Sequence, residues 1–113
     1  MSRINSNQKG KAGEREIANV FKSYGFEDAR RSQQYAGINN DADVVGLPNM
    51  HVEVKRVERL NIDNAVEQMM EDKREDELGI VAHRKNHKKW LVTMTLDEWM
   101  EIYKRYLITL EEK

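Results

Sequence analysis

Two short runs rich in β-branched residues, separated by a turn, constrain the fold of this chain more than any other feature. Residues 43–47 read DVVGL, residues 51–57 read HVEVKRV, and Pro48-Asn49 lies between them. Valine is enriched in strands, and a Pro-Asn pair favours a turn. The sequence therefore predicts two antiparallel strands joined by a tight connection.

Charged residues lie within this predicted strand pair. Side chains alternate between the two faces of a strand, so Glu53 and Lys55 share one face. Val52 and Val54 point to the other face. Antiparallel pairing through the turn is expected to bring Asp43 close to Glu53. The hairpin thus predicts two carboxylates and an ammonium group on an apolar background.

Helical and strand periodicities alternate along the rest of the chain. Apolar residues recur at helical spacing in three segments, residues 12–24, 62–73 and 95–110. Strand-like runs occupy residues 26–32, 80–83 and 90–94. The polar residues 1–9 are predicted to form a flexible arm, and the amide-rich residues 33–40 are predicted to form a loop.

Capping residues mark the ends of the first two predicted helices. Gly25 suits the C′ position that stops the first helix, and Gly79 is predicted to end the second. Asn61 or Asp63 favours the start of the second helix, since both side chains can accept a hydrogen bond from a backbone N–H of the first turn.

The third predicted helix carries a broad apolar stripe. Thr95 as N-cap, followed by Glu98, fits a capping box at its start. Within this stripe, Trp99, Met100 and Tyr103 are expected to pack in the core with Met69 and Met70, and part of the stripe is a candidate dimer contact. Its members are Leu96, Trp99, Met100, Tyr103, Leu107 and Leu110.

The order of the elements predicts a single α/β domain over residues 10–113. A chain of 113 residues is long enough for one core. The order of helix, three strands, helix, two strands and helix predicts a central mixed β-sheet flanked by helices. Because the sequence has no cysteine, no long apolar run and no apolar signal-peptide core, we expect a cytoplasmic protein without a membrane partner.

Composition does not by itself indicate nucleic-acid binding, since the formal net charge is -1. Residues 1–60 hold ten Lys and Arg against eight Asp and Glu, whereas residues 61–113 hold nine against twelve. Charge is also segregated locally, because residues 71–77 are mainly acidic and residues 84–89 are basic. A DNA-binding surface therefore fits the sequence without being required by it.

Two interpretations fit the charged strand pair. In the first, Asp43, Glu53 and Lys55 form ordinary cross-strand ion pairs on an exposed sheet face. In the second, the surrounding valines indicate a buried strand, where charges need compensation. Paired carboxylates bind Mg²⁺, and a neighbouring lysine can orient a water or stabilise charge on a phosphate. The second interpretation predicts phosphodiester hydrolysis.

A third carboxylate belongs to the first predicted helix. Glu14 lies one turn before Ile17, on or beside the apolar face of that helix. Stabilisation by the positive N-terminal end of the helix dipole is its alternative role.

The ordered set of these motifs resembles the archaeal-type Holliday junction resolvases, a branch of the PD-(D/E)xK nuclease superfamily that also includes phage-encoded proteins. An isolated Glu-x-Lys is a weak signal, but the ordered set in its helix and strand context is specific to the superfamily. The resemblance covers roughly residues 8–110 and implies a restriction-endonuclease-like fold. It rests on Lys9-Gly10, GERE at residues 13–16, YGF at residues 24–26, RRS at residues 30–32, DVVG at residues 43–46 and VEVK at residues 52–55.

The resemblance implies a metal centre. Asp43 and Glu53 would bind Mg²⁺, or Mn²⁺ in its place, together with the backbone carbonyl of Val54. Glu14 would complete the acidic cluster directly or through water. Lys55 would position the attacking water.

Two further polar residues are accessory candidates. Asp41 offers a second acid before the same strand, although Asp43 directly precedes the valines and is the better ligand. Asp41 is therefore expected in the loop or behind the metal ligands. Gln68 lies on the helix after the Glu-x-Lys strand, where related nucleases often place a glutamine near the active site, and a surface amide is its alternative role.

Basic residues near these motifs are candidates for DNA contacts. Guanidinium groups suit phosphate oxygens, and backbone contacts dominate DNA affinity. The resemblance places the N-terminal arm and the loop before Asp43 against the junction, whereas solvated surface charge is the alternative role. The candidates are Lys9, Lys11, Arg15, Arg30, Arg31 and Ser32.

The three histidines are not predicted to bind metal. His83 and His87 have HxxxH spacing, but they fall across a strand end and a hairpin and would not share a helical face for zinc. A basic turn that contacts DNA, or one that is simply solvated, is the expectation for this segment. His51 is expected to be a solvent-facing turn residue.

The predicted function is that of a Mg²⁺-dependent, structure-specific endonuclease that resolves four-way DNA junctions during recombination or repair. A homodimer would match the two-fold symmetry of a junction. One alternative is a nuclease of the same superfamily that cuts flaps, nicks or duplex DNA. Another is a non-catalytic dimeric DNA-binding module whose carboxylates are structural.

Overall fold

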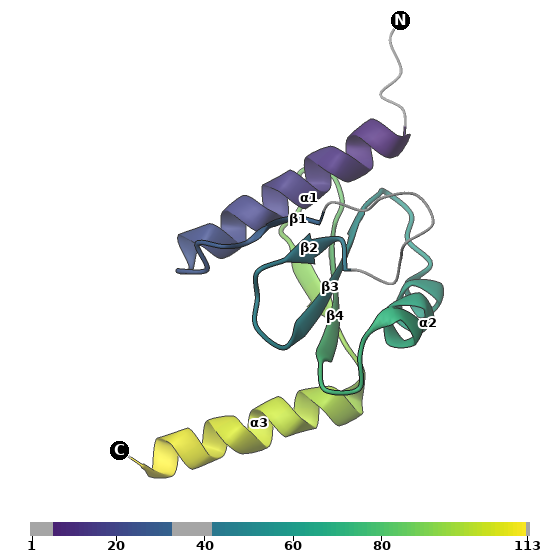
Figure 1. Ribbon diagram of the computed structural model, residues 1–113. Helices are drawn as coiled ribbons and strands as arrows, with labels where there is room; N and C mark the ends of the chain where they lie inside the picture. The colour runs from purple at the N-terminus through teal and green to yellow at the C-terminus, as the bar shows by residue number, and fades with distance from the viewer. Residues whose placement is uncertain (1–5, 33–41, 113) are drawn as a thin grey trace, which may run out of the picture.

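The structure, a computed structural model, describes residues 6–32 and 42–112. One five-stranded mixed sheet with three helices confirms the predicted α/β class. The strands lie side by side in chain order, and Figure 1 shows α1 and α3 near opposite ends of the sheet. The elements are α1 (Ser6–Ser23), β1 (Arg30–Arg31), β2 (Val44–Val45), β3 (Met50–Arg56), α2 (Ile62–Asp72), β4 (Leu78–Arg84), β5 (Leu91–Thr93) and α3 (Leu96–Glu111).

Helix α1 begins earlier than its apolar pattern predicts. The helix starts at Ser6, whereas the spacing of apolar residues predicts a start at Ala12. Residues 6–9 of the predicted arm are therefore helical, and residues 1–5 lie outside the described part of the chain. The added turns contain no apolar residue, so periodicity gave no sign of them.

The predicted caps at the end of α1 and the start of α2 are confirmed. Gly25 has a φ of 103°, and its N–H donates to the carbonyl oxygen of Lys22 at 2.9 Å. This is the left-handed C′ position that favours glycine. The side chain of Asn61 accepts a hydrogen bond from the N–H of Asn64 at 3.1 Å, so Asn61 is the N-cap of α2.

Strands β1, β2 and β3 form the predicted antiparallel meander, but β1 and β2 have only two residues each. Strand β2 ends before Gly46, which has a φ of 103°. A Cβ atom at Gly46 would lie 2.3 Å from the carbonyl oxygen of Asp28, so only glycine fits this close approach. The prediction of a strand through Leu47 is therefore wrong. The predicted loop at residues 33–40 lies outside the described residues.

Strands β3 and β4 form the centre of the sheet and pair in parallel, from Met50 opposite Leu78 to Arg56 opposite Arg84. Helix α2 connects them, as parallel strands require.

Gly79 lies inside β4 and does not end α2, which stops at Asp72, so its predicted role is wrong. A Cβ atom at Gly79 would lie 2.0 Å from the sulfur of Met69. Gly79 therefore permits close packing of α2 on the sheet.

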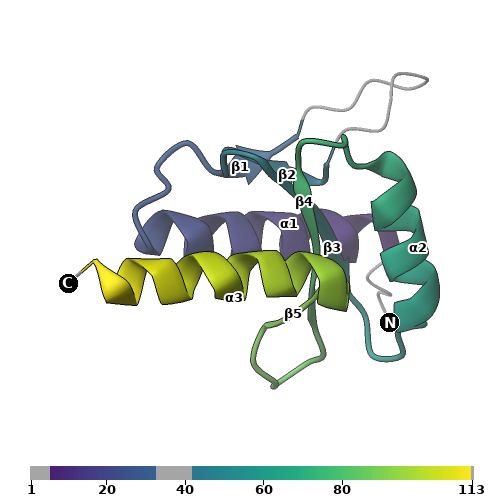
Figure 2. The ribbon, with the colours of Figure 1, turned by 90° about the horizontal axis from the view of Figure 1, so that it is seen from below.

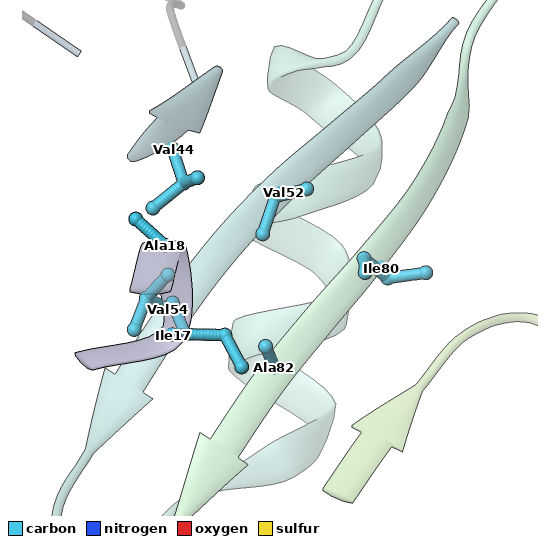
Figure 3. Packing of buried hydrophobic residues seen from close by; sticks show 7 residues of the cluster. All are labelled: Ile17, Ala18, Val44, Val52, Val54, Ile80 and Ala82. Atoms are coloured by element: carbon cyan, nitrogen blue, oxygen red, sulfur yellow. The ribbon is translucent and has the colours of Figure 1, made fainter. Parts of the chain in front are cut away.

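Each face of the sheet is covered by a different helix. On one face, Ala65 and Met69 of α2 pack against Val81 of β4. On the other face, α1 packs against the valines of β2 and β3, and Figure 3 shows the side chains of this larger cluster on α1 and on the neighbouring strands. Its members are Ile17, Ala18, Val44, Val52, Val54, Ile80 and Ala82.

Helix α3 departs from the predicted core role. Thr95 is its N-cap, as predicted, and accepts a hydrogen bond from the N–H of Glu98. The reciprocal half of the capping box does not form, because the Glu98 carboxylate instead accepts the N–H of Gly79 at 2.7 Å. No residue of α3 is buried, so the prediction that its stripe packs in the core with Met69 is wrong. Figures 1 and 2 show the helix extending away from the sheet.

No helix in the described ranges is both long and apolar enough to cross a membrane.

Candidate metal centre and nucleic-acid interface

Two carboxylates meet on the sheet face that α2 covers. Val44 pairs with Val52 and both point toward α1, so the alternation of side chains turns Asp43 and Glu53 to the opposite face. Oδ2 of Asp43 accepts the backbone N–H of Val54 at 2.9 Å. Burial and the charge of Glu53 together raise the pKa of Asp43 to about 7. The hairpin thus brings the two carboxylates together, as its sequence predicts.

His51 is buried beside Glu53, and the prediction that it faces solvent is wrong. Its side chain is 2% exposed, and its Nε2 lies 2.7 Å from Oε1 of Glu53. Its Nδ1 lies 3.9 Å from Oε1 of Glu77, which precedes β4. His51 and Glu53 share a face because they are two residues apart in β3, so strand alternation was the signal that could have located His51.

Two opposing effects act on the pKa of His51. Burial lowers it, but the hydrogen bond and charge of Glu53, with the charges of Glu77 and Asp72, outweigh burial and raise the pKa above its ordinary value. The charged imidazolium is therefore favoured beside Glu53. Within the core, Glu53 therefore has a hydrogen-bonding partner from its own strand, and it favours the charged form of that partner.

Glu14 does not join the two strand carboxylates directly. Its Oε1 accepts the Arg31 Nε–H at 3.0 Å, which links α1 to β1. The charge of Glu14 still contributes to raising the pKa of Asp43. Within residues 6–32 and 42–112, no group of three His, Asp or Glu side chains is arranged to hold a metal ion. The described chain therefore brings together two of the three predicted acids.

The remaining predicted site residues have different surroundings. Lys55 is half-buried on the same face as Glu53, and its ammonium group makes no hydrogen bond or ion pair with any residue that the structure describes. Gln68 is exposed on α2, and its amide donates to Asp72 at 3.1 Å, so it is a surface amide in this structure. Asp41 lies outside the described residues.

A basic groove lies between α1 and β1. Its volume is about 430 Å³. It brings four of the predicted DNA contacts together, and Lys22 and Asn19 join them although the sequence analysis did not select them. Their spacing from Arg15 is helical, so a search for one polar face of α1 would have found them. The lining residues are Arg15, Ala18, Asn19, Lys22, Arg30, Arg31 and Ser32.

The other two predicted DNA contacts lie on α1 before this groove. Lys11 is exposed one turn before Arg15, on the same side of the helix. The backbone of Lys9 belongs to α1, and its side chain is outside the described part of the structure.

A second basic pocket, of about 690 Å³, lies near the β4–β5 turn. Lys85, Lys88 and Lys89 of the predicted basic turn line it, together with Arg59 and Arg84. The rest of the lining is acidic, imidazole or apolar and consists of Glu58, Leu60, Ile62, His83 and Leu91. Because the strands lie in chain order, β1 forms one edge of the sheet and β5 forms the other. The two basic pockets therefore belong to different edges of the sheet.

The histidines of the HxxxH pair lie in different surroundings. His83 is within hydrogen-bond distance of Oγ1 of Thr93, at 2.8 Å, and burial lowers the pKa of its imidazole. His87 is exposed in the turn, with a φ of 62°.

Glu16 is a structural carboxylate that the sequence analysis did not select. Oε1 of Glu16 accepts a hydrogen bond from Trp90 Nε1 at 2.8 Å and also contacts the Arg84 guanidinium. These contacts join α1 to the β4–β5 region.

Comparison of this chain with protein-family models, with curated proteins and with solved structures finds no match.

Proposed function

We propose that this protein is a metal-dependent DNA endonuclease of the PD-(D/E)xK fold that cuts four-way junctions. The observation that carries the proposal is the pair formed by Asp43 and Glu53, in which burial and mutual repulsion raise the pKa of Asp43 to about 7. Two carboxylates buried side by side destabilise each other when both are charged. A divalent cation removes that repulsion and holds both groups in their charged form.

The donor set suits a hard divalent cation. Asp43, Glu53 and the backbone carbonyl of Val54 supply only oxygen atoms. Mg²⁺ commonly takes one or two protein carboxylates and completes its shell with water and substrate phosphate, so a direct bond from Glu14 is not needed. Mn²⁺ accepts the same ligands. When bound, the cation would supply Lewis-acid activation of the scissile phosphate and a more acidic water.

The other residues of this face and of the groove have separate roles in the proposal. The Lys55 ammonium group would hold the attacking water or stabilise the charge that develops on the phosphate oxygens. Arg30, Arg31 and Lys22 would hold the DNA backbone in the groove between α1 and β1.

Two basic pockets at different edges of the sheet support a substrate with more than one duplex segment. A homodimer would present two catalytic centres, one for each of the two strands that must be cut.

A non-catalytic DNA-binding module is the second candidate, and one specific observation favours it. His51 already gives Glu53 a buried hydrogen-bonding partner, and Arg31 gives Glu14 a half-buried cationic partner. In that case the carboxylates would stabilise the fold and would bind no metal.

Cleavage of labelled DNA separates these candidates. The purified protein is incubated with a four-way junction, a flap, a nicked duplex and a linear duplex, each with Mg²⁺, Mn²⁺ or EDTA. Asp43→Asn and Lys55→Ala are tested beside the exposed controls Asp76→Asn and Lys104→Ala. Circular dichroism verifies that each variant is folded.

We expect paired, metal-dependent nicks in the junction that fall at least about 100-fold in both site variants and persist in both controls. Binding of the junction without cleavage in either metal would favour the non-catalytic module. Cleavage of flaps or duplex instead would keep the site and change the substrate. Full activity in both site variants would contradict the proposed centre.

A further inference from the structure

Helix α3 exposes a continuous band of large apolar side chains. Seven of them, which we call the α3 stripe, are between 39% and 69% exposed. Monomeric proteins seldom leave apolar patches of this extent in water unless a partner covers them. The α3 stripe consists of Leu96, Trp99, Met100, Tyr103, Tyr106, Leu107 and Leu110.

The α3 stripe is one face of the helix. At about 100° per residue, all seven members lie within about 60° of Tyr103 around the helix axis. The rings of Trp99 and Tyr103 stack with their centroids 5.3 Å apart, and those of Tyr103 and Tyr106 stack at 6.5 Å. The stripe is therefore an ordered aromatic surface within the helix itself.

The first turn of α3 is fixed to the sheet on the side away from the stripe. Glu98 lies about 140° from Tyr103 around the axis. Its Oε1 accepts the N–H of Gly79 at 2.7 Å, and its Oε2 lies 3.1 Å from Nζ of Lys73. The side chains of Glu98 and Lys73 are only 13% and 10% exposed. Turning the stripe back onto its own sheet would break both contacts.

The exposed area is close to what a stable interface between two chains needs. A large apolar side chain has on the order of 200 Å² of surface, so the partly exposed stripe presents on the order of 600 Å² per chain. Two such stripes in contact would bury about 1,200 Å² in total, the lower end of the range for specific interfaces.

We propose that the α3 stripe is the interface between two copies of this chain, packed α3 against α3 in antiparallel orientation about a two-fold axis at Tyr103. The proposal rests on α3 alone and does not depend on nuclease activity.

The arrangement of residues along α3 fits a two-fold axis. In both directions from Tyr103, apolar residues occur three, four and seven positions away. An antiparallel pair about this point therefore places apolar residues of one copy at the level of apolar residues of the other.

The mass in solution tests the interface. Sedimentation and light scattering are run over a wide range of protein concentrations on wild type, Tyr103→Glu and Tyr106→Glu. Ile108→Glu is the matched control, because Ile108 is an exposed apolar residue of the same helix that lies about 140° from Tyr103.

We expect wild type and Ile108→Glu to have twice the 13.3 kDa chain mass. Each stripe variant should weaken dimerisation at least about 30-fold while keeping its circular dichroism spectrum. A wild type that remains monomeric at all concentrations would overturn the proposal, whether the stripe proves to fold back or to capture a different protein. A dimer that both stripe variants leave intact would overturn it as well.

Disulfide cross-linking tests the orientation, and the absence of cysteine from the chain makes single-cysteine variants unambiguous. Under mild oxidation, Tyr103→Cys should form a covalent dimer, because the two copies of this position meet at the axis. Leu96→Cys should cross-link when mixed with Leu110→Cys but not by itself. Self-linking of Leu96→Cys would instead establish a parallel pair and contradict the antiparallel arrangement.

Discussion

The sheet face under α2 and the helix α3 depart from the usual distribution of side chains in opposite directions. The sheet face buries Glu53 and His51, whereas α3 leaves the α3 stripe in water. Charged groups are seldom fully buried, and large apolar patches are seldom fully exposed. Each region therefore lacks a compensating partner, and the kind of partner differs between the two. The buried carboxylates call for positive charge, and the stripe calls for another apolar surface.

The two regions also differ in how firmly the fold fixes them. Strand β3 lies between β2 and β4, so the register of both pairings holds Glu53 on the buried face. Helix α3 is joined to the sheet chiefly through Glu98 in its first turn. The carboxylates cannot leave their position without breaking the sheet, whereas the stripe can be covered or uncovered without a change in the rest of the fold.

The largest change in stability is expected when the charge of Asp43 is removed, because Asp43 and Glu53 repel each other when both are charged. In EDTA at pH 8, Asp43→Asn should raise the free energy of unfolding by as much as about 4 kcal/mol relative to wild type. The pKa of Asp43 is raised from 3.8 to about 7, so the folded state binds this proton more tightly than the unfolded state does. Wild type should therefore lose stability as the pH rises from about 4 to about 7, and Asp43→Asn should not.

Urea denaturation across this pH range measures the difference between the two proteins. Because His51 is present in both, effects of its titration largely cancel in that difference. Asp76→Asn, an exposed aspartate variant, should follow wild type. A difference between Asp43→Asn and wild type that does not change with pH would mean that the two carboxylates are not coupled.

Addition of Mg²⁺ should affect the stability of wild type and of Asp43→Asn differently. A cation that binds only the folded protein should stabilise wild type at pH 8, and the gain should grow with the logarithm of its concentration. Asp43→Asn should gain much less, because it lacks one charged ligand. An equal shift in thermal midpoint for both proteins would indicate that the cation binds elsewhere.

The next largest change in stability is expected from replacing His51, which lies within hydrogen-bond distance of Glu53. His51→Leu should lower the free energy of unfolding of the metal-free protein by about 2–3 kcal/mol, because it leaves a buried carboxylate without its hydrogen bond. His51→Gln keeps a donor and should recover part of the loss. Urea denaturation of both variants, with exposed His87→Leu as control, checks this order. If His51→Leu and His51→Gln are equally stable, the hydrogen bond to Glu53 does not stabilise the fold.

A smaller effect is expected where α3 joins the sheet. Glu98→Ala should lower stability by about 2 kcal/mol, since it leaves the Gly79 N–H and the Lys73 ammonium group without their acceptor. Glu101→Ala, an exposed glutamate variant on the same helix, should change it by less than about 0.5 kcal/mol. Thermal melts compare the two variants. Equal melting temperatures would show that Glu98 does not fix α3.

The smallest effect is expected in the basic groove. Arg30→Ala and Lys22→Ala should each reduce the slope of log K against log salt for junction binding by about 0.9, the value for one lost phosphate contact on duplex DNA. Lys104→Ala, on the far helix α3, should leave the slope unchanged. Fluorescence anisotropy over a range of salt concentrations gives the three slopes. Unchanged slopes in both groove variants would show that the groove does not contact DNA.

Local patterns predicted much of the fold. The helix stop at Gly25, the N-caps Asn61 and Thr95, and the β-hairpin all appear as the sequence predicts. Strand alternation also predicted that Asp43 and Glu53 would meet. These features depend on backbone geometry and on residues that are a few positions apart or that pair across one short turn. They can therefore be predicted from local sequence.

Features that join distant segments were not predicted. The Arg31 side chain draws Glu14 away from the strand carboxylates, and Gly79 makes room for Met69 of a packed helix. His51 is buried on the sheet face that α2 covers, where Glu77 approaches it from a segment outside its own strand. Each of these depends on how separate elements approach one another, which no local periodicity records.

The sequence by itself determined that α3 is an amphipathic helix, and that two carboxylates and a lysine share one face of a strand. Only the tertiary structure decided that Glu53 is buried with Asp43 half-buried beside it, and that the α3 stripe is exposed. The physical reason is that periodicity fixes which side chains lie on the same face of an element. Which surface covers that face depends on the packing of whole elements, and for α3 no surface of the described chain does so.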